Sequence, residues 1–165
     1  MEKSIWYAVY TRSRREKKVA ELLINDGYQA YLPLVKTLRQ WSDRKKMVEV
    51  PLISLYVFVN VSEREYYNVL NTPGVVRYVT FEGKAAPIRN SEIEAMKMAI
   101  EGNLNVTLTQ ESIDLGQKVK IIAGPMRGAE GEYVETKHKS NFIINLNNIG
   151  FTLKVEVNAL DVVKL

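Results

Sequence analysis

The sequence contains no cysteine and a single histidine, His138, so several kinds of chemistry are excluded at the outset. Disulfides, thiolate metal sites and cysteine nucleophiles all need a thiol. One imidazole leaves little for a zinc site or for acid–base work near neutral pH. No apolar run approaches the roughly 18 residues of a membrane-spanning helix, and the N-terminus has no apolar signal core. We therefore expect a cytoplasmic binding protein with no metal, no cofactor and no catalytic residue.

Positive charge is unevenly distributed along the chain. The 165 residues carry a net charge of +4. Residues 1–101 contain 16 Lys and Arg against 12 Asp and Glu, whereas residues 102–165 contain 7 of each kind. This asymmetry indicates that the first part binds a polyanion and the second part binds something else. The alternative is the ordinary surface charge of a soluble protein.

The first hundred residues alternate between strand and helix patterns. From Glu16 the apolar residues fall on one helical face, and Gly27 is placed to end that helix. Ser-x-x-Glu capping boxes at Ser62 and Ser91 each predict a further helix. Strand patterns cover residues 5–11, 29–38, 53–61 and 75–81. This order favours an α+β fold in which an antiparallel sheet carries three helices.

The second half of the chain has a different character. Residues 102–113 show no helical period and predict a linker between a domain at 1–101 and a domain at 114–165. In the latter, short strand patterns alternate with glycine turns, which indicates a small all-β barrel. Three residues suit a tight turn between its strands and have a structural role in this prediction: Gly124, Pro125 and Gly128.

Motifs in both halves resemble those of the NusG family of transcription elongation factors. Residues 6–10 (WYAVY) look like the opening of the family's N-terminal (NGN) domain, 51–59 like its central strand, and 72–75 like the turn after its second helix. Residues 116–131 look like a KOW motif, which some ribosomal proteins also carry. The segment 12–15 (RSRR) replaces a glycine-containing segment of general NusG proteins. The run Tyr10-Thr11-Arg12 and the compact N-terminal domain look more like the specialised, RfaH-like paralogues of exopolysaccharide operons.

The resemblance implies a polymerase-binding groove on the N-terminal sheet. Tyr56 and Phe58 lie two apart and therefore share one strand face. The opposite parity, Leu55, Val57 and Val59, supplies an aliphatic core face. The alternative is that the aromatic rings themselves belong to the core. The residues that the resemblance assigns to binding the clamp helices of RNA polymerase are Tyr10, Tyr56, Phe58 and Thr72.

Two basic clusters form a second candidate surface. One lies between the first strand and the first helix, and the other lies at the tip of a predicted hairpin. Lysine and arginine neutralise phosphates, and an exposed tryptophan stacks on an unpaired base. In the family that the chain resembles, this surface faces the non-template DNA strand. The alternatives are solvated surface charges and a tryptophan that pins the hairpin to its domain. The residues are Arg12, Arg14, Arg15, Lys18, Arg39, Trp41, Arg44, Lys45 and Lys46.

These features together predict a monomeric, non-catalytic factor that is not associated with a membrane and suppresses pausing and termination. Its KOW domain would recruit a ribosomal protein or a termination factor. The rival interpretation is a ribosome-associated RNA-binding protein with a KOW domain. In RfaH itself the C-terminal segment can form a helical hairpin. Here residues 114–165 contain five glycines and Pro125, and we expect strands instead.

Overall fold

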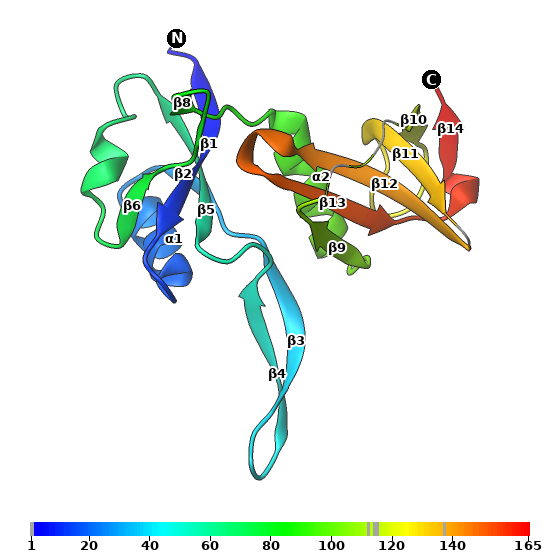
Figure 1. The fold of residues 1–165 in the computed structure, drawn as a ribbon, viewed down its shortest axis with the longest axis horizontal. Coiled ribbons are helices and arrows are strands. Elements are labelled where there is room, and N and C mark those ends of the chain that lie inside the picture. Colours follow the sequence, from blue (N-terminus) through cyan, green and yellow to red (C-terminus); the bar gives the residue numbers. More distant parts are fainter. Residues whose placement is uncertain (1, 112, 114–115, 137) are drawn as a thin grey trace. The chain divides into compact units, whose positions relative to one another are not determined.

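The computed structural model describes residues 2–111, 113, 116–136 and 138–165, and the chain divides into two compact units between Pro87 and Ile88. The predicted boundary between linker and barrel falls partly on residues 112, 114 and 115, which lie outside the described residues. Figure 1 shows the elements of both units.

A four-stranded antiparallel sheet is the framework of the first unit (Figure 1). Helix α1 (Glu16–Asn25) covers one face, where Val19 and Leu23 join Val57 and Val59 in the buried core. In order across the sheet, the strands are β2 (Gln29–Tyr31), β5 (Tyr56–Ser62), β1 (Ser4–Thr11) and β6 (Val75–Tyr78). Residues 57 and 59 thus lie on the aliphatic core face, as their parity predicts.

Leu55 does not belong to that core face, so this part of the prediction is wrong. Its side chain is 40% exposed, and its backbone has φ of 71°, a left-handed conformation. Its N–H donates to the carboxylate of the buried Glu16 at 3.1 Å, and its carbonyl accepts from Thr11 N–H at 2.8 Å. These bonds hold Leu55 in a turn, and strand β5 begins only at the next residue.

Two hairpins complete the first unit. The predicted strand at 29–38 is interrupted at Pro33, which has no N–H to donate and separates β2 from the following strand. The polar stretch at 39–46 forms the tip of a hairpin, as predicted. The hairpin strands are β3 (Leu34–Gln40) with β4 (Lys45–Pro51), and β7 (Thr80–Phe81) with β8 (Lys84–Ala85).

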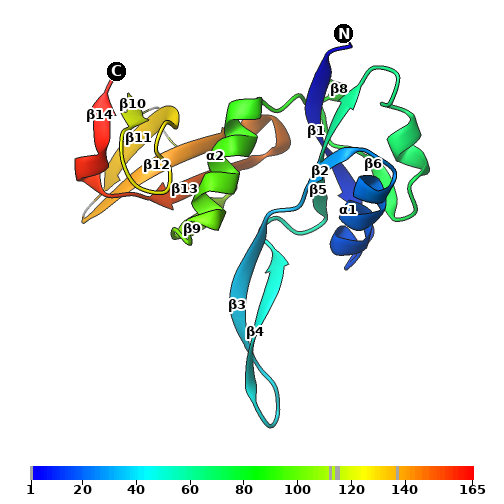
Figure 2. The ribbon, with the colours of Figure 1, turned by 180° about the vertical axis from the view of Figure 1, so that it is seen from behind.

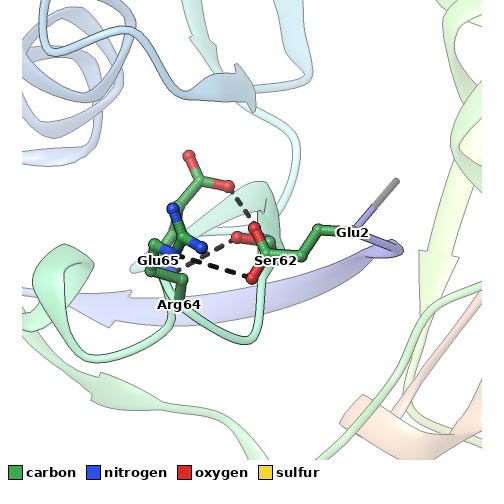
Figure 3. A network of polar contacts seen from close by, with 4 residues as sticks. All are labelled: Glu2, Ser62, Arg64 and Glu65. Atoms are coloured by element: carbon green, nitrogen blue, oxygen red, sulfur yellow. Dashed lines mark hydrogen bonds and ion pairs between the residues drawn. The ribbon is translucent and has the colours of Figure 1, made fainter.

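The predicted second helix is only one turn of 3-10 helix, η1 (Asn68–Asn71). Its capping box does form: Ser62 N–H donates to Glu65 Oε1 at 3.0 Å, and Glu65 N–H donates to Ser62 Oγ at 3.4 Å (Figure 3). The segment then contains tyrosine, asparagine and valine, and Pro73 ends it. Because these residues are weak helix formers, the short segment does not recover the cost of helix nucleation.

The second unit combines one helix with a six-stranded antiparallel sheet. Helix α2 (Asn90–Glu101) packs against β12 (Lys139–Leu146), and Figure 2 shows it crossing one face of that sheet. Short 3-10 turns lie at two places: η2 (Asn147–Ile149) follows β12, and η3 (Ala159–Asp161) precedes β14 (Val162–Lys164). In order across the sheet, the strands are β14 (Val162–Lys164), β10 (Gln117–Ile121), β11 (Glu130–Thr136), β12 (Lys139–Leu146), β13 (Phe151–Glu156) and β9 (Val106–Thr109).

The division into units differs from the predicted one in two respects. Helix α2, expected in the N-terminal domain, lies in the second unit, so only α1 remains of the three helices predicted for the first. The predicted linker contributes strand β9, which pairs with β13. A four-residue edge strand carries too little alternation to be distinguished from a linker by sequence. Residues after 116 form strands as expected, but the described pairings form an open sheet ending in β9 and β14 rather than a closed barrel.

Candidate functional site

The sheet face opposite α1 brings two predicted site residues into contact. Tyr10 on β1 lies directly opposite Tyr56 on β5 and opposite Arg77 on β6. The Tyr56 hydroxyl donates to the Tyr10 hydroxyl at 3.2 Å, and the two rings meet edge to face with centroids 4.9 Å apart. The guanidinium carbon of Arg77 lies 4.6 Å from the centroid of the Tyr10 ring, a cation–π arrangement.

These aromatic residues differ sharply in exposure. Tyr56 is 8% exposed, Phe58 is fully buried, and Tyr10 is half-buried. The ring of Tyr31 stacks on Phe58 with centroids 6.5 Å apart. Tyr56 and Phe58 are therefore buried in this structure, as the core alternative expects, and their role in polymerase binding stays a prediction. The accessible part of the cluster is Tyr10 with the exposed Arg77.

Burial and the hydrogen bond to Tyr10 also affect the ionisation of Tyr56. Loss of solvent, the larger cause, and the bond to Tyr10 raise the pKa of Tyr56 well above its usual value, although Arg77 acts in the opposite direction. The Tyr56 hydroxyl therefore stays protonated throughout the physiological range. A protonated hydroxyl can donate to Tyr10 and fix the position of that ring.

Thr72 occupies a turn that leads into β6. It is 6% exposed, its N–H donates to the carbonyl of Val69 at 3.1 Å, and its carbonyl accepts from Val75 N–H at 3.1 Å. Gly74 inside this turn has φ of 94°, as the third position of a type II turn requires. These hydrogen bonds fix Thr72 in the turn. They are separate from the ring contacts that join Tyr10, Tyr56 and Arg77.

The first basic cluster lies where β1 passes into α1. Arg12 N–H donates to the carbonyl of Gly74 at 2.9 Å, which anchors the backbone at the start of the loop. Arg14 has φ of 61°, and Lys18 lies 3.8 Å from Glu21 in an exposed ion pair. The side chains of all four cluster residues are exposed: Arg12, Arg14, Arg15 and Lys18.

The second basic cluster lies at the end of the β3–β4 hairpin, which projects from the first unit's sheet (Figure 1). Trp41 N–H donates to the carbonyl of Arg44 at 2.7 Å and closes the tip. The guanidinium carbon of Arg44 lies 5.3 Å from the Trp41 ring centroid, and that ring is 47% exposed. Trp41 therefore has an accessible ring at the tip. All the basic members of this cluster are exposed: Arg39, Arg44, Lys45 and Lys46.

The sequence patterns did not reveal two features of these surfaces. Arg77 carries no signal in the sequence, and its place opposite Tyr10 follows only from the pairing of β1 with β6. The sequence also does not indicate that Leu38 and Met47 are exposed. They face each other on the hairpin and are 55% and 56% exposed. Alternation along a strand marks apolar residues as candidates for the core, and only the folded structure shows that this pair is exposed.

In the second unit, two large apolar residues of strand β12 lie in the core. Phe142 is 1% exposed and Ile144 is 2% exposed, whereas Phe151 is half-buried. The turn between β10 and β11 holds Gly124 at φ of 81° and Gly128 at 93°, conformations that favour glycine. Pro125 follows the first of these. Among the described residues of this unit, the large apolar side chains that are exposed include Ile122, Leu160, Val163 and Leu165.

The described residues hold neither a helix that could cross a membrane nor a cluster of metal ligands. None of the described helices is long and apolar enough for a membrane span. In the same part of the chain, no group of three or more His, Cys, Asp or Glu side chains is arranged to hold a metal ion.

Comparison with known proteins identifies the family. The family model described as transcription termination factor NusG matches residues 4–97, more than half of the 165-residue chain. The chain belongs to the NusG family. The NusG match extends from β1 into α2 and includes both basic clusters and the Tyr10–Tyr56–Arg77 contacts. Transcription is therefore the process in which this NusG-family protein acts, and it belongs to a family of non-enzymatic factors.

Solved structures provide further comparisons. A structure concerning domain interaction in Thermotoga maritima NusG is 23% identical, with 99% of this chain and 98% of that chain covered and a TM-score of 0.48. The MjSpt4:Spt5 complex in conformation A is 21% identical, with 98% of each chain covered and a TM-score of 0.33. No curated protein matches the sequence.

Proposed function

We propose that this protein is a transcription elongation and antitermination factor that binds the clamp helices of RNA polymerase and the non-template DNA strand. The observation that supports polymerase binding best is the Tyr10–Tyr56–Arg77 arrangement. A half-exposed ring held by a buried hydroxyl and an arginine loses little rotamer freedom on binding, so it suits a hot spot for a partner helix. The polymerase-binding part lies within residues 1–101.

The two basic clusters support the DNA-binding part of the proposal. The hairpin holds an exposed tryptophan among four exposed cations, and the β1–α1 loop with the first turn of α1 holds four more. This combination of ring and charge suits unpaired DNA, because every base offers a face for stacking and every phosphate a negative charge. The RSRR segment at 12–15 supports assignment to the RfaH-like paralogues of exopolysaccharide operons.

The mechanism is a shift of population between polymerase states. The protein suppresses pausing only if it binds the elongating polymerase more tightly than the paused one. The KOW-like residues at 114–165 recruit a ribosomal protein or a termination factor, and the covalent connection through 102–113 raises the local concentration of that partner. The protein acts as a monomer in the cytoplasm and uses no cofactor.

The direct test is a polymerase pull-down with the full-length chain, followed by transcription across a terminator with and without it. We expect polymerase to be retained and read-through to increase. Binding to structured RNA in the absence of polymerase, with no retention of polymerase, would instead support the ribosome-associated alternative, which rests on the KOW-like motif.

The hairpin prediction concerns salt dependence. Changing Arg39, Arg44, Lys45 and Lys46 together to serine should weaken binding to a bubble or single-stranded DNA. It should also reduce the slope of log affinity against log salt concentration by about 0.7 for each phosphate that the hairpin no longer neutralises. Fluorescence anisotropy at several salt concentrations measures this slope.

A matched control has the same composition but removes exposed charges from the second unit. Its four changes to serine are at Arg89, Arg127, Lys118 and Lys164. The control should keep the wild-type slope, and both variants should still bind polymerase. An equal decrease in slope for the two variants would show that the hairpin has no specific role in DNA binding.

A further inference from the structure

A tyrosine-lined cavity lies at the end of the first unit's sheet remote from Tyr10. It has a volume of about 420 Å³ and lies where β1 begins and β5 ends. Its apolar floor includes Ile5 and Val61, and three tyrosines line it: Tyr7, Tyr66 and Tyr67. Polar lining comes from Glu2, Lys3, Ser62 and Glu63. Neither the polymerase nor the DNA surface proposed above uses any of these residues.

The tyrosine rings are held in a fixed cluster. The Tyr66 ring stacks on Tyr78 with centroids 4.1 Å apart, and Tyr7 and Tyr67 meet it edge to face at 5.7 Å and 5.0 Å. The Tyr78 hydroxyl donates to the carbonyl of Tyr66 at 2.6 Å. Tyr67 is nevertheless 73% exposed, so this ring is ordered by its neighbours and still accessible.

The charge of the cavity favours a cation. Two carboxylates, Glu2 and Glu63, and one ammonium, Lys3, line it. Burial is the main cause that raises the pKa of Tyr66 and Tyr78, so their rings stay neutral, and a neutral ring attracts a cation through its quadrupole. Acidic groups beside aromatic rings repel the phosphates of DNA, so a nucleic acid is a poor occupant.

One cation of the chain already lies at this rim. Arg64 Nε is 3.8 Å from Glu2 Oε1, and the Arg64 side chain is 82% exposed (Figure 3). The capping bonds between Ser62 and Glu65 hold the backbone on either side of it. A long, exposed ion pair contributes little stability, so an incoming cation can displace Arg64 from Glu2 at small cost.

We propose that this cavity is a docking site for a lysine or arginine side chain in a basic segment of a partner protein. The cation lies against Tyr66 and Tyr67 with Glu63 beside it, and its aliphatic stem covers Ile5 and Val61. Strand β1 connects this site to the Tyr10 surface: Ser4 pairs with Ser62 at one end, and Tyr10 pairs with Tyr56 at the other. Six residues of strand separate the ends by about 20 Å, so both surfaces are available at once.

The test is a titration of the full-length chain with the peptide acetyl-Gly-Lys-Gly-amide, followed by the aromatic NMR signals of the tyrosines. The anionic peptide acetyl-Gly-Glu-Gly-amide is the matched control. We expect saturable shifts at Tyr7, Tyr66 and Tyr67 with the lysine peptide, no saturation with the anionic one, and weaker binding at higher salt. Absence of saturation, or equal shifts with both peptides, would overturn the proposal.

Variants test whether those NMR shifts arise from binding in the cavity. Tyr67→Ala and Glu63→Gln each remove an exposed group, so the fold should remain intact. Each should lower the affinity of the chain for the lysine peptide about three- to tenfold. Glu111→Gln removes an exposed carboxylate from the second unit and should leave the affinity unchanged. If all three variants behaved alike, the binding would be non-specific attraction to acidic residues and the docking site would be rejected.

Discussion

Phe58→Ala is expected to lower the free energy of unfolding by about 3–5 kcal/mol, the cost of deleting a fully buried aromatic side chain and leaving a cavity. Phe58 is completely inaccessible, and Tyr31 stacks on its ring. The measurement is urea denaturation of the full-length chain, in which the midpoint should fall while the slope of free energy against urea is unchanged.

Met47→Ala is the matched control for that experiment. It also removes a large apolar side chain, but from a position on the hairpin that is 56% exposed, so its effect should lie within about 0.5 kcal/mol of zero. If Phe58→Ala were as stable as Met47→Ala, the ring would not be a core residue. The interpretation of Phe58 as part of an open polymerase groove would then regain its support.

Tyr10→Ala should weaken polymerase binding by about 30-fold or more, since truncating a hot-spot aromatic residue costs about 2 kcal/mol and 1.4 kcal/mol corresponds to a factor of ten. Tyr10 is only half-buried, so the variant should remain folded, as circular dichroism can confirm. Quantitative pull-down against polymerase concentration measures the loss.

The control for Tyr10 is Tyr10→Phe, which keeps the ring under Arg77 and removes only the hydroxyl that accepts from Tyr56. It should retain most of the affinity. A folded Tyr10→Ala chain that binds polymerase normally would place the polymerase contact elsewhere. Alanine at Tyr56 or Phe58 is less informative for this purpose. Both side chains are buried, so truncating either one would destabilise the fold and could not be separated from a loss of binding.

The hairpin was predictable because its sequence carries the information locally. A run of polar residues between two apolar segments with matching alternation predicts a turn, and β3 and β4 pair around that turn. The exposed positions of Arg39 and Lys46 follow from the same pattern. The exposed pair of Leu38 and Met47 does not, because local alternation cannot show whether a core lies against that face.

The second predicted helix illustrates a local signal that the rest of its segment did not support. The capping box at Ser62 formed with both of its hydrogen bonds, and yet only one 3-10 turn followed at Asn68–Asn71. A cap satisfies the first donors of a helix but contributes little to propagation, which depends on the residues that follow. The capping box at Ser62 therefore forms without a regular helix beginning at that residue.

The sequence by itself determined the strand parity that separates Val57 and Val59 from Tyr56 and Phe58, because side chains alternate along any extended chain. It also determined the basic hairpin and the strand-rich second half. Only the tertiary structure decided that both faces of β5 are buried, that Arg77 lies on Tyr10, and that α2 packs with β12. Those features depend on which elements meet across long sequence separations. The local helix or strand propensity and the spacing of apolar residues contain no information about which distant elements come into contact.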